Sequence, residues 1–278
     1  MARKKVIAHY ESAGEYLDSV RNTPSHSSWG GDYTGRSDGD KWAGCSYAEA
    51  YRLASDGWGE GLKKLTGNMS VLRTNGKGNA RVCDYGGDFP IVGRAIAGLP
   101  DSMSRRKIAD SSRKPIIDIY VSPVMSSAGS ADKMITLGAG IADFIDSCEA
   151  VGYSVNVTVS MIATANGGLV GSVFPIKKGG QALDLERLVY FIAHPSFLRR
   201  LGFRDFTNKF TESELGLGMG RTAAGSDHAG LHEQGAIMFL TNASVVNFIS
   251  KPEDARAWVE SQVKAQRPEL MDSLSNAA

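Results

Sequence analysis

The run Ile116-Ile-Asp-Ile-Tyr-Val-Ser122 decides the fold, because its β-branched and apolar residues are typical of a buried strand. A helical pattern follows over residues 132–151, and a second β-rich run covers 153–163. A strand, a crossover of helix length and another strand form a right-handed unit of parallel strands. The sequence therefore predicts an α/β fold built around residues 116–163.

Strands and helices continue to alternate toward the C-terminus. After the turn at Asn166-Gly167-Gly168, residues 169–176 predict an antiparallel strand at the sheet edge. We expect helices at 184–193 and at 196–201, the latter closed by Gly202, and a buried strand at 236–241. A last helix begins where Ser250 and Glu253 have capping-box spacing, and the residues after Arg267 are expected to fray. Residues 115–278 thus predict a mainly parallel, Rossmann-like sheet flanked by helices.

Residues 1–114 predict an irregular, basic region packed on that domain. Ser12 and Ser46 each stand three residues before a glutamate, which predicts the starts of two short helices, and Gly57 is placed to end the second. Between them, residues 22–44 are dense in Ser, Gly, Asp and Thr, as in a long loop. A further helix is expected at 90–97.

Composition limits the class of protein. The chain has 278 residues, 42% of them hydrophobic and 22% charged, which is typical of a globular protein. Its three cysteines are far apart and odd in number, so we expect reduced thiols and a cytoplasmic location. Neither a signal peptide nor a run of about 18 apolar residues is present in the sequence, so a soluble, intracellular protein without a membrane partner is expected.

Positive charge is concentrated in one segment. Between Gly61 and Lys114 eleven Lys and Arg stand against four Asp, a local charge of +7 within a chain of net charge +1. Such a segment can attract polyanions, although a solvated face is the alternative. The candidate nucleic-acid contacts are Arg105, Arg106, Lys107, Arg113 and Lys114, together with Arg199 and Arg200 of the aromatic and basic run 194–204.

Four potential metal ligands, Asp227, His228, His232 and Glu233, fall within seven residues. Histidines four apart share one face of a helix, which is how helical zinc sites are built. Three nearby glycines disfavour a helix, so a polar loop is the alternative. If the cluster is functional, the sequence predicts a metal site at His228 and His232, and a metal-dependent hydrolase.

Two other motifs lack the context that their chemistry requires. The pattern GxSxG at 35–39 lies in a polar stretch with no strand before it, whereas a nucleophile elbow needs a strand-to-helix turn. The glycine-rich run 216–220 follows no strand, and the sequence contains no GxxxxGK[ST] motif. We therefore expect no cofactor and, more generally, no enzymatic activity.

The order of elements from 116 to 266 resembles the von Willebrand A-type domain. That family carries a metal-dependent adhesion site, DxSxS, where its first strand ends. Here Tyr120-Val-Ser122-Pro-Val124 has the same spacing, with tyrosine in place of the aspartate and valine in place of the second serine. One hydroxyl cannot hold a hard divalent cation. The resemblance implies an interaction module whose adhesion metal site has been lost.

Three blocks of sequence resemble an uncharacterised family of tailed bacteriophages. They are Ser46-Tyr-Ala-Glu-Ala-Tyr-Arg-Leu-Ala-Ser-Asp-Gly-Trp-Gly-Glu-Gly61, Gly98-Leu-Pro-Asp-Ser-Met103 and His194-Pro-Ser-Phe-Leu-Arg-Arg-Leu-Gly-Phe203. This resemblance implies a viral protein made in the bacterial host cytoplasm. The sequence thus predicts a non-enzymatic binding or adaptor protein whose partner is nucleic acid or another phage or host protein, with a structural virion component as a further alternative.

Overall fold

The computed structural model describes residues 4–21, 42–66, 81–84, 89–90, 95–97, 99, 102–106, 115–125, 130–165, 168–181, 184–210, 221–228, 231–232, 235–241, 245 and 248–277. Its strands are β1 Lys4–His9, β2 Arg81–Asp84, β3 Phe89–Pro90, β4 Met103–Arg106, β5 Ile116–Ser122, β6 Ser154–Ala165, β7 Gly168–Lys177, β8 Arg221–Thr222 and β9 Ile237–Leu240. Its helices are α1 Ala13–Arg21, α3 Tyr47–Asp56, α4 Gly59–Thr66, α6 Ala131–Ala150, α7 Leu185–Ala193, the π-helix η1 Phe197–Gly202, α8 Phe203–Lys209, α10 Gly225–His228, α12 Pro252–Gln266 and α13 Pro268–Ala277.

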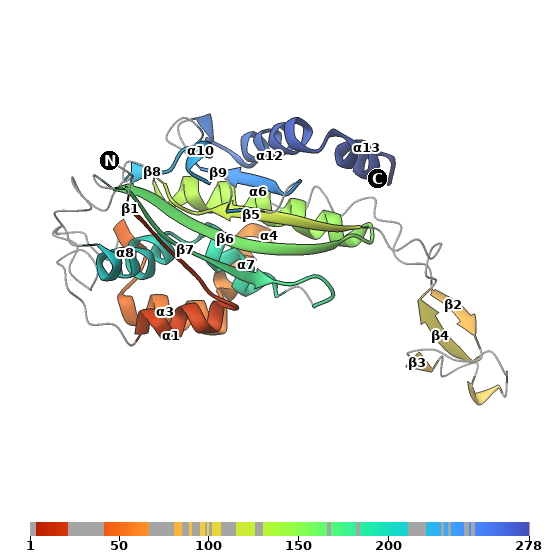
Figure 1. Cartoon of the computed structure of the whole chain (residues 1–278). Coiled ribbons are helices and arrows are strands. Elements are labelled where there is room, and N and C mark those ends of the chain that lie inside the picture. The colour runs from red at the N-terminus through yellow and green to blue at the C-terminus, as the bar shows by residue number, and fades with distance from the viewer. Residues whose placement is uncertain are drawn as a thin grey trace.

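The main sheet has the order β1-β7-β6-β5-β9, and the short strand β8 pairs with β6 beyond the end of β5. Strands β6 and β9 both run parallel to β5, β1 runs parallel to β7, and β7 is antiparallel to β6. Figure 1 shows the long, twisted strands β6 and β7 crossing the middle of the molecule. The expected α/β fold with a mainly parallel sheet is confirmed, and the unit β5–α6–β6 is its centre.

One face of this sheet carries the main core. Val121, Val159, Phe174 and Phe239 are ladder neighbours across four strands, so their side chains share a face. Helix α1 covers it where Tyr16 stacks on Phe174 at 4.2 Å between ring centroids. Helices α6 and α12 cover it through Phe144 and Trp258, which both contact Phe239. The N-terminal helices therefore share one core with the central unit.

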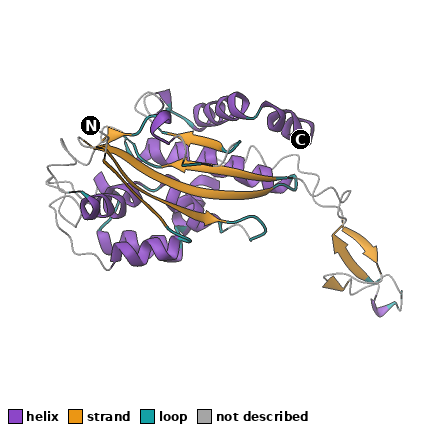
Figure 2. Ribbon diagram, in the orientation of Figure 1, coloured by secondary structure: helices purple, strands orange, loops and turns teal. Residues whose placement is uncertain are grey.

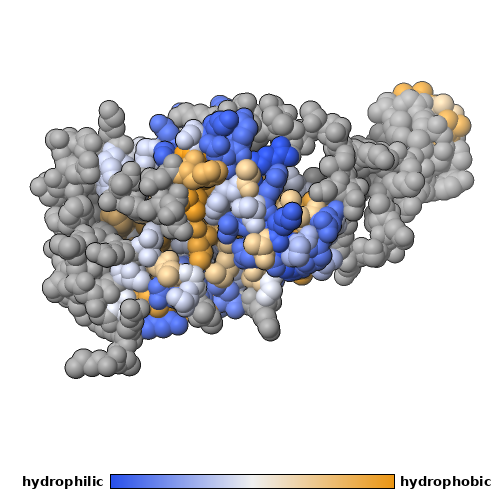
Figure 3. All heavy atoms as spheres, turned by 90° about the horizontal axis from the view of Figure 1, so that it is seen from above, coloured by the Kyte–Doolittle hydropathy of each residue, from blue (hydrophilic) through white to orange (hydrophobic). Residues whose placement is uncertain are grey.

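The opposite face carries a smaller cluster. Ile162, Leu169 and Val173 are buried there and pack against Ile7, Ala223 and Leu231. Ala223 and Leu231, which lie between β8 and β9 in the sequence, thus cover part of this face. Among the described residues no helix is long and apolar enough to cross a bilayer. Seen from above, the described surface is largely hydrophilic, with a strip of hydrophobic residues across its middle (Figure 3).

A second, three-stranded sheet has the order β2-β4-β3 and is antiparallel throughout. Figure 2 shows its strands well apart from those of the main sheet. These strands come from the basic segment, of which residues 67–80, 85–88, 91–94, 98, 100–101 and 107–114 lie outside the described part. The helix expected at 90–97 is replaced at its start by β3, and residues 91–94 are not described.

Most local signals were interpreted correctly. Ser12 and Ser46 cap α1 and α3 by accepting from the backbone N–H of Glu15 and Glu49. Gly57 ends α3 in a positive-φ conformation, with φ of 96°, while its N–H donates to the carbonyl of Leu53. Such a conformation favours glycine because a Cβ would be strained there. The loop expected at 22–44 lies mostly outside the described residues.

Four details were wrong. Strand β7 is not an edge strand, because β1, which the sequence analysis did not predict, pairs with its outer side. Gly202 does not close a helix: η1 continues directly into α8, and the close approach of Met161 explains the glycine. Asp254, rather than Glu253, accepts from the backbone of Ser250 and Lys251 at the start of α12. Finally, residues 268–277 form α13 instead of fraying.

Candidate functional site

The predicted basic surface is represented in the described residues by the ladder between β2 and β4. Its register pairs Arg81 with Arg106 and Val82 with Arg105. The backbone register therefore sets positions 81 and 106 opposite each other, whereas position 105 belongs to the other face of the ladder, because successive residues of a strand alternate between faces. Of the other predicted contacts in this segment, Lys107, Arg113 and Lys114 lie outside the described residues. The backbone register thus places Arg106 opposite Arg81, a residue that the sequence analysis counted but did not single out.

Arg199 and Arg200 occupy a different environment, inside the π-helix η1. Their exposed fractions are 2% and 0%. The Nη1 of Arg199 donates to the carbonyl of Trp42 at 2.6 Å, and its guanidinium lies 4.5 Å from the indole centroid. The Nε of Arg200 donates to the carbonyl of Cys45 at 2.9 Å. Both side chains thus hold residues 42–45 against the core, and a contact with nucleic acid remains a prediction for them.

Two of the three sequence blocks pack against each other at this point. Arg204 lies 4.4 Å from the ring of Tyr47, and His194 meets Trp58 edge-on at 4.5 Å. The Nδ1 of His194 in turn is 2.7 Å from the hydroxyl of Ser196. Ser196 is fully buried, so this pair fixes the turn before η1 and has no access to a substrate. The blocks 46–61 and 194–203 therefore form one packed unit.

The histidine pair lies over the second face of the sheet. His228 ends α10, and His232 follows four residues later, with 5.5 Å between the ring centroids and 25° between the ring planes. The Nδ1 of His228 is 3.3 Å from the hydroxyl of Ser160 on β6, and the ring of His232 packs on Tyr120 of β5 at 4.2 Å. The structure thus brings His228 and His232 together, whereas Glu233 is outside the described residues.

Burial controls the ionisation of this pair. It lowers the pKa of His228 to about 4, and the neighbouring His232 lowers that pKa further than burial alone would. Burial also lowers the pKa of His232. Both imidazoles are therefore neutral at pH 7, with one nitrogen lone pair each. Asp227 accepts from the backbone N–H of Ala224. Within the described part of the chain, no third His, Cys, Asp or Glu side chain joins this pair, and no other group of three such side chains is found.

The region that resembles an adhesion site contains ordinary structural contacts. Ser122 is buried, and its carbonyl accepts from the hydroxyl of Thr241, which also reaches the carbonyl of Val124. Asp118 accepts from the amide of Asn156 at 2.7 Å. These contacts join β5 to β6 and to the end of β9. The GxSxG and glycine-rich motifs, at 35–39 and 216–220, lie outside the described residues.

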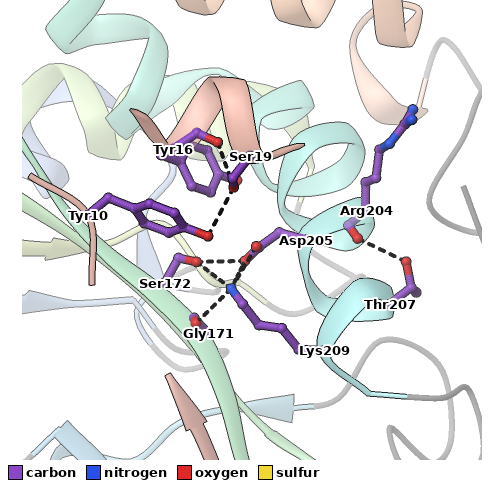
Figure 4. A network of polar contacts seen from close by, with 9 residues as sticks. All are labelled: Tyr10, Tyr16, Ser19, Gly171, Ser172, Arg204, Asp205, Thr207 and Lys209. Atoms are coloured by element: carbon purple, nitrogen blue, oxygen red, sulfur yellow. Dashed lines mark hydrogen bonds and ion pairs between the residues drawn. The ribbon is translucent and has the colours of Figure 1, made fainter. Parts of the chain in front are cut away.

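A buried polar network that the sequence analysis missed joins β7 to α8 (Figure 4). The ammonium of Lys209 lies 2.6 and 2.7 Å from the two carboxylate oxygens of Asp205 and also contacts Ser172 and the carbonyl of Gly171. Ser172 in turn donates to Asp205 at 2.9 Å. Burial lowers the pKa of Lys209, while Asp205 opposes that shift. The serine is fully buried, so the network fastens α8 to the sheet.

Comparison with known proteins identifies a family. No curated protein and no solved structure matches the chain. A family model described as a domain of unknown function, DUF7192, matches residues 2–266, which is nearly the whole chain. The chain therefore belongs to the DUF7192 family.

Proposed function

We propose that this protein is a non-enzymatic nucleic-acid-binding protein, and that the sheet β2-β4-β3 carries its interface. The observation that supports this proposal is the backbone register that sets two arginine positions, 81 and 106, opposite each other in a ladder separate from the main sheet. Arginine at two opposed positions of one ladder suits a phosphate ligand, since guanidinium groups match phosphate oxygens with two hydrogen bonds.

The surrounding sequence supports the same surface. The segment from Gly61 to Lys114 has a charge of +7, and the rest of the chain must then be acidic, because the net charge is only +1. A basic segment next to an acidic body orients the protein toward a polyanion during encounter. The main sheet, with its single large core, acts in this proposal as the rigid support.

The test is a fluorescence-anisotropy titration of labelled single-stranded and double-stranded oligonucleotides across a salt series. For duplex DNA, log K should fall linearly with log salt, by about 0.9 per phosphate contact. The double variant Arg81→Ala/Arg106→Ala should weaken binding and reduce that slope by about 2. Arg105→Ala should reduce it further.

The matched control is Lys251→Ala/Lys264→Ala, which removes two exposed cations from the start and end of the α12 region. It should leave the affinity and the salt slope nearly unchanged. If both double variants weaken binding equally, the attraction comes from net charge and the interface is not on β2 and β4. An absence of binding at low salt would reject the nucleic-acid proposal and leave a protein partner as the remaining version of the binding function.

Three finer expectations accompany this proposal. The phage-like blocks at 46–61, 98–103 and 194–203 support a bacteriophage protein made in the host cytoplasm. The order β7-β6-β5-β9, with β7 antiparallel, supports a relationship to von Willebrand A-type domains. A structural role in a virion would instead produce large particles on size-exclusion chromatography of the purified chain. The alternative proposal, a metal-dependent hydrolase, depends on metal binding by His228 and His232.

A further inference from the structure

The histidine pair has the spacing of two ligands to one metal ion. With Zn–N bonds of about 2.0–2.1 Å, two imidazoles on one ion have ring centroids roughly 5–5.5 Å apart. The centroids of His228 and His232 are 5.5 Å apart. The two rings keep this distance while they contact different partners: His228 approaches the hydroxyl of Ser160, and His232 packs on Tyr120.

The surroundings orient both rings. Metal-bound histidines usually donate their second nitrogen to a nearby acceptor, which fixes the ring and its tautomer. The hydroxyl of Ser160, fully buried on β6, stands at Nδ1 of His228 and can serve as this acceptor. Its Nε2 then carries the lone pair. Tyr120 holds the other ring by packing against it at 4.2 Å.

His232 provides the second, independent observation. Both of its ring nitrogens are buried; the backbone of Leu231 can satisfy one of them, and at least one nitrogen is left without a hydrogen-bond partner among the described residues. A buried polar atom without a partner costs about 1–3 kcal/mol. Coordination of one nitrogen to a cation would remove part of this cost.

We propose that His228 and His232 bind one borderline divalent transition-metal ion, such as Zn²⁺ or Co²⁺. Imidazole nitrogen suits these ions, whereas Mg²⁺ and Ca²⁺ prefer oxygen ligands. Ser160 is a positioning residue that orients His228. Because two imidazoles fill only part of a coordination sphere, water would complete it. This inference does not depend on the nucleic-acid proposal.

The test is a titration of metal-free protein with Co²⁺, in which the visible absorption of the bound Co²⁺ is measured. A parallel titration with Zn²⁺ is measured by calorimetry. We expect one equivalent bound per chain. His228→Ala and His232→Ala should each abolish the absorption band. Ser160→Ala should keep the stoichiometry and weaken binding by about tenfold, as loss of an orienting partner does. His9→Ala, which removes an exposed histidine from β1, is the control and should bind normally.

A measurement on the unmodified protein guards against variants that fail to fold. Zn²⁺ should shift the side-chain NMR signals of two of the five histidines, and the variants assign these two as His228 and His232. The proposal is overturned if Co²⁺ and Zn²⁺ do not bind, if binding persists in both histidine variants, or if Zn²⁺ shifts only the signal that His9→Ala removes.

Discussion

Lys209 and Asp205 form an ion pair that lies almost wholly inside the protein, with side-chain exposures of 11% and 4%. Lys209→Met would leave the carboxylate of Asp205 buried without its cation. We expect this change to lower the free energy of unfolding by about 3–5 kcal/mol, measured by urea denaturation. The double variant Asp205→Asn/Lys209→Met should recover part of the loss, because its asparagine side chain carries no charge.

The exposed pair Arg256–Glu260, with exposures of 45% and 48%, is the matched comparison. Arg256→Ala should cost less than about 1 kcal/mol, since solvent screens both charges. Equal costs for Lys209→Met and Arg256→Ala would show that the network around Lys209 is solvated.

Asp143 on α6 gives a pH-dependent prediction. Burial raises its pKa to about 6, Arg256 opposes this shift, and Asp146 adds to it. The folded protein therefore binds a proton more tightly than the unfolded chain, so this carboxyl stabilises the fold at low pH, and the effect is lost as pH rises through about 6. Asp143→Asn should thus be more favourable at pH 8 than at pH 4, relative to the wild type. Thermal unfolding of both proteins from pH 4 to 8 measures this difference, and a pH-independent difference would contradict it.

The sequence alone could predict part of the candidate site. The spacing of His228 and His232 in the chain indicated a shared face, but Ser160 stands 68 positions away from His228 and carries no local signal. Charge likewise indicated Arg199 and Arg200 as surface groups. Their partners are the carbonyls of Trp42 and Cys45, more than 150 positions away, and only the tertiary fold brings such groups together.

At the scale of elements, the contact between α6 and α7 depends on a single glycine. A Cβ on Gly138 would lie 2.6 Å from the Cα of Ala193 and closer still to its Cβ, so the helix backbones would have to separate. Gly140, two positions further along α6, faces Ala255 of α12 with a nearest distance of 3.2 Å. Both glycines lie inside the same helix and would gain about 1 kcal/mol of helix propensity on mutation to alanine.

The two alanine variants therefore form a matched pair. Gly138→Ala should be destabilising, because overpacking costs about 1–3 kcal/mol or more when backbone atoms block relaxation. Gly140→Ala should be close to neutral. Chemical denaturation of both variants separates the cost of the contact between α6 and α7 from the gain in helix propensity, because both variants share that gain. An equal change in the free energy of unfolding of the two variants would mean that α7 shifts freely relative to α6.

Element types were easier to predict than their neighbours. The limits of β5 and nearly those of α6 follow from composition and capping, since both are properties of local sequence. Strand β1 was missed because Lys4–His9 contains only a short apolar run. The position of β1 beside β7 depends on its pairing with residues that lie 164 positions further along the chain. The continuation of η1 into α8 was missed because Gly202 resembles a helix end.

At the scale of the whole molecule, β9 is an outer strand of the main sheet, and α12 covers its open side. The side chain of Gln266 accepts from the N–H of Met238 at 2.8 Å and donates to its carbonyl at 2.9 Å. The side-chain amide of Gln266 thus makes two hydrogen bonds with the backbone of Met238 that a neighbouring strand would otherwise make. Unpaired edge strands associate with other chains, so this contact shields the edge of β9 from such association.

Gln266→Ala should expose these two backbone groups. We expect a small loss of stability, about 1 kcal/mol, because the hydrogen bonds are exposed to water. The larger effect should be concentration-dependent self-association, measured by sedimentation velocity at increasing protein concentration. Gln262→Ala, one turn earlier on α12, removes a glutamine side chain that makes no hydrogen bond to β9 among the described residues, and its self-association should match that of the wild type. Equal self-association of the Gln266 and Gln262 variants would show that the contact of Gln266 with β9 does not prevent association. The pairing of β9 with β5 would then account for the stability of this edge strand.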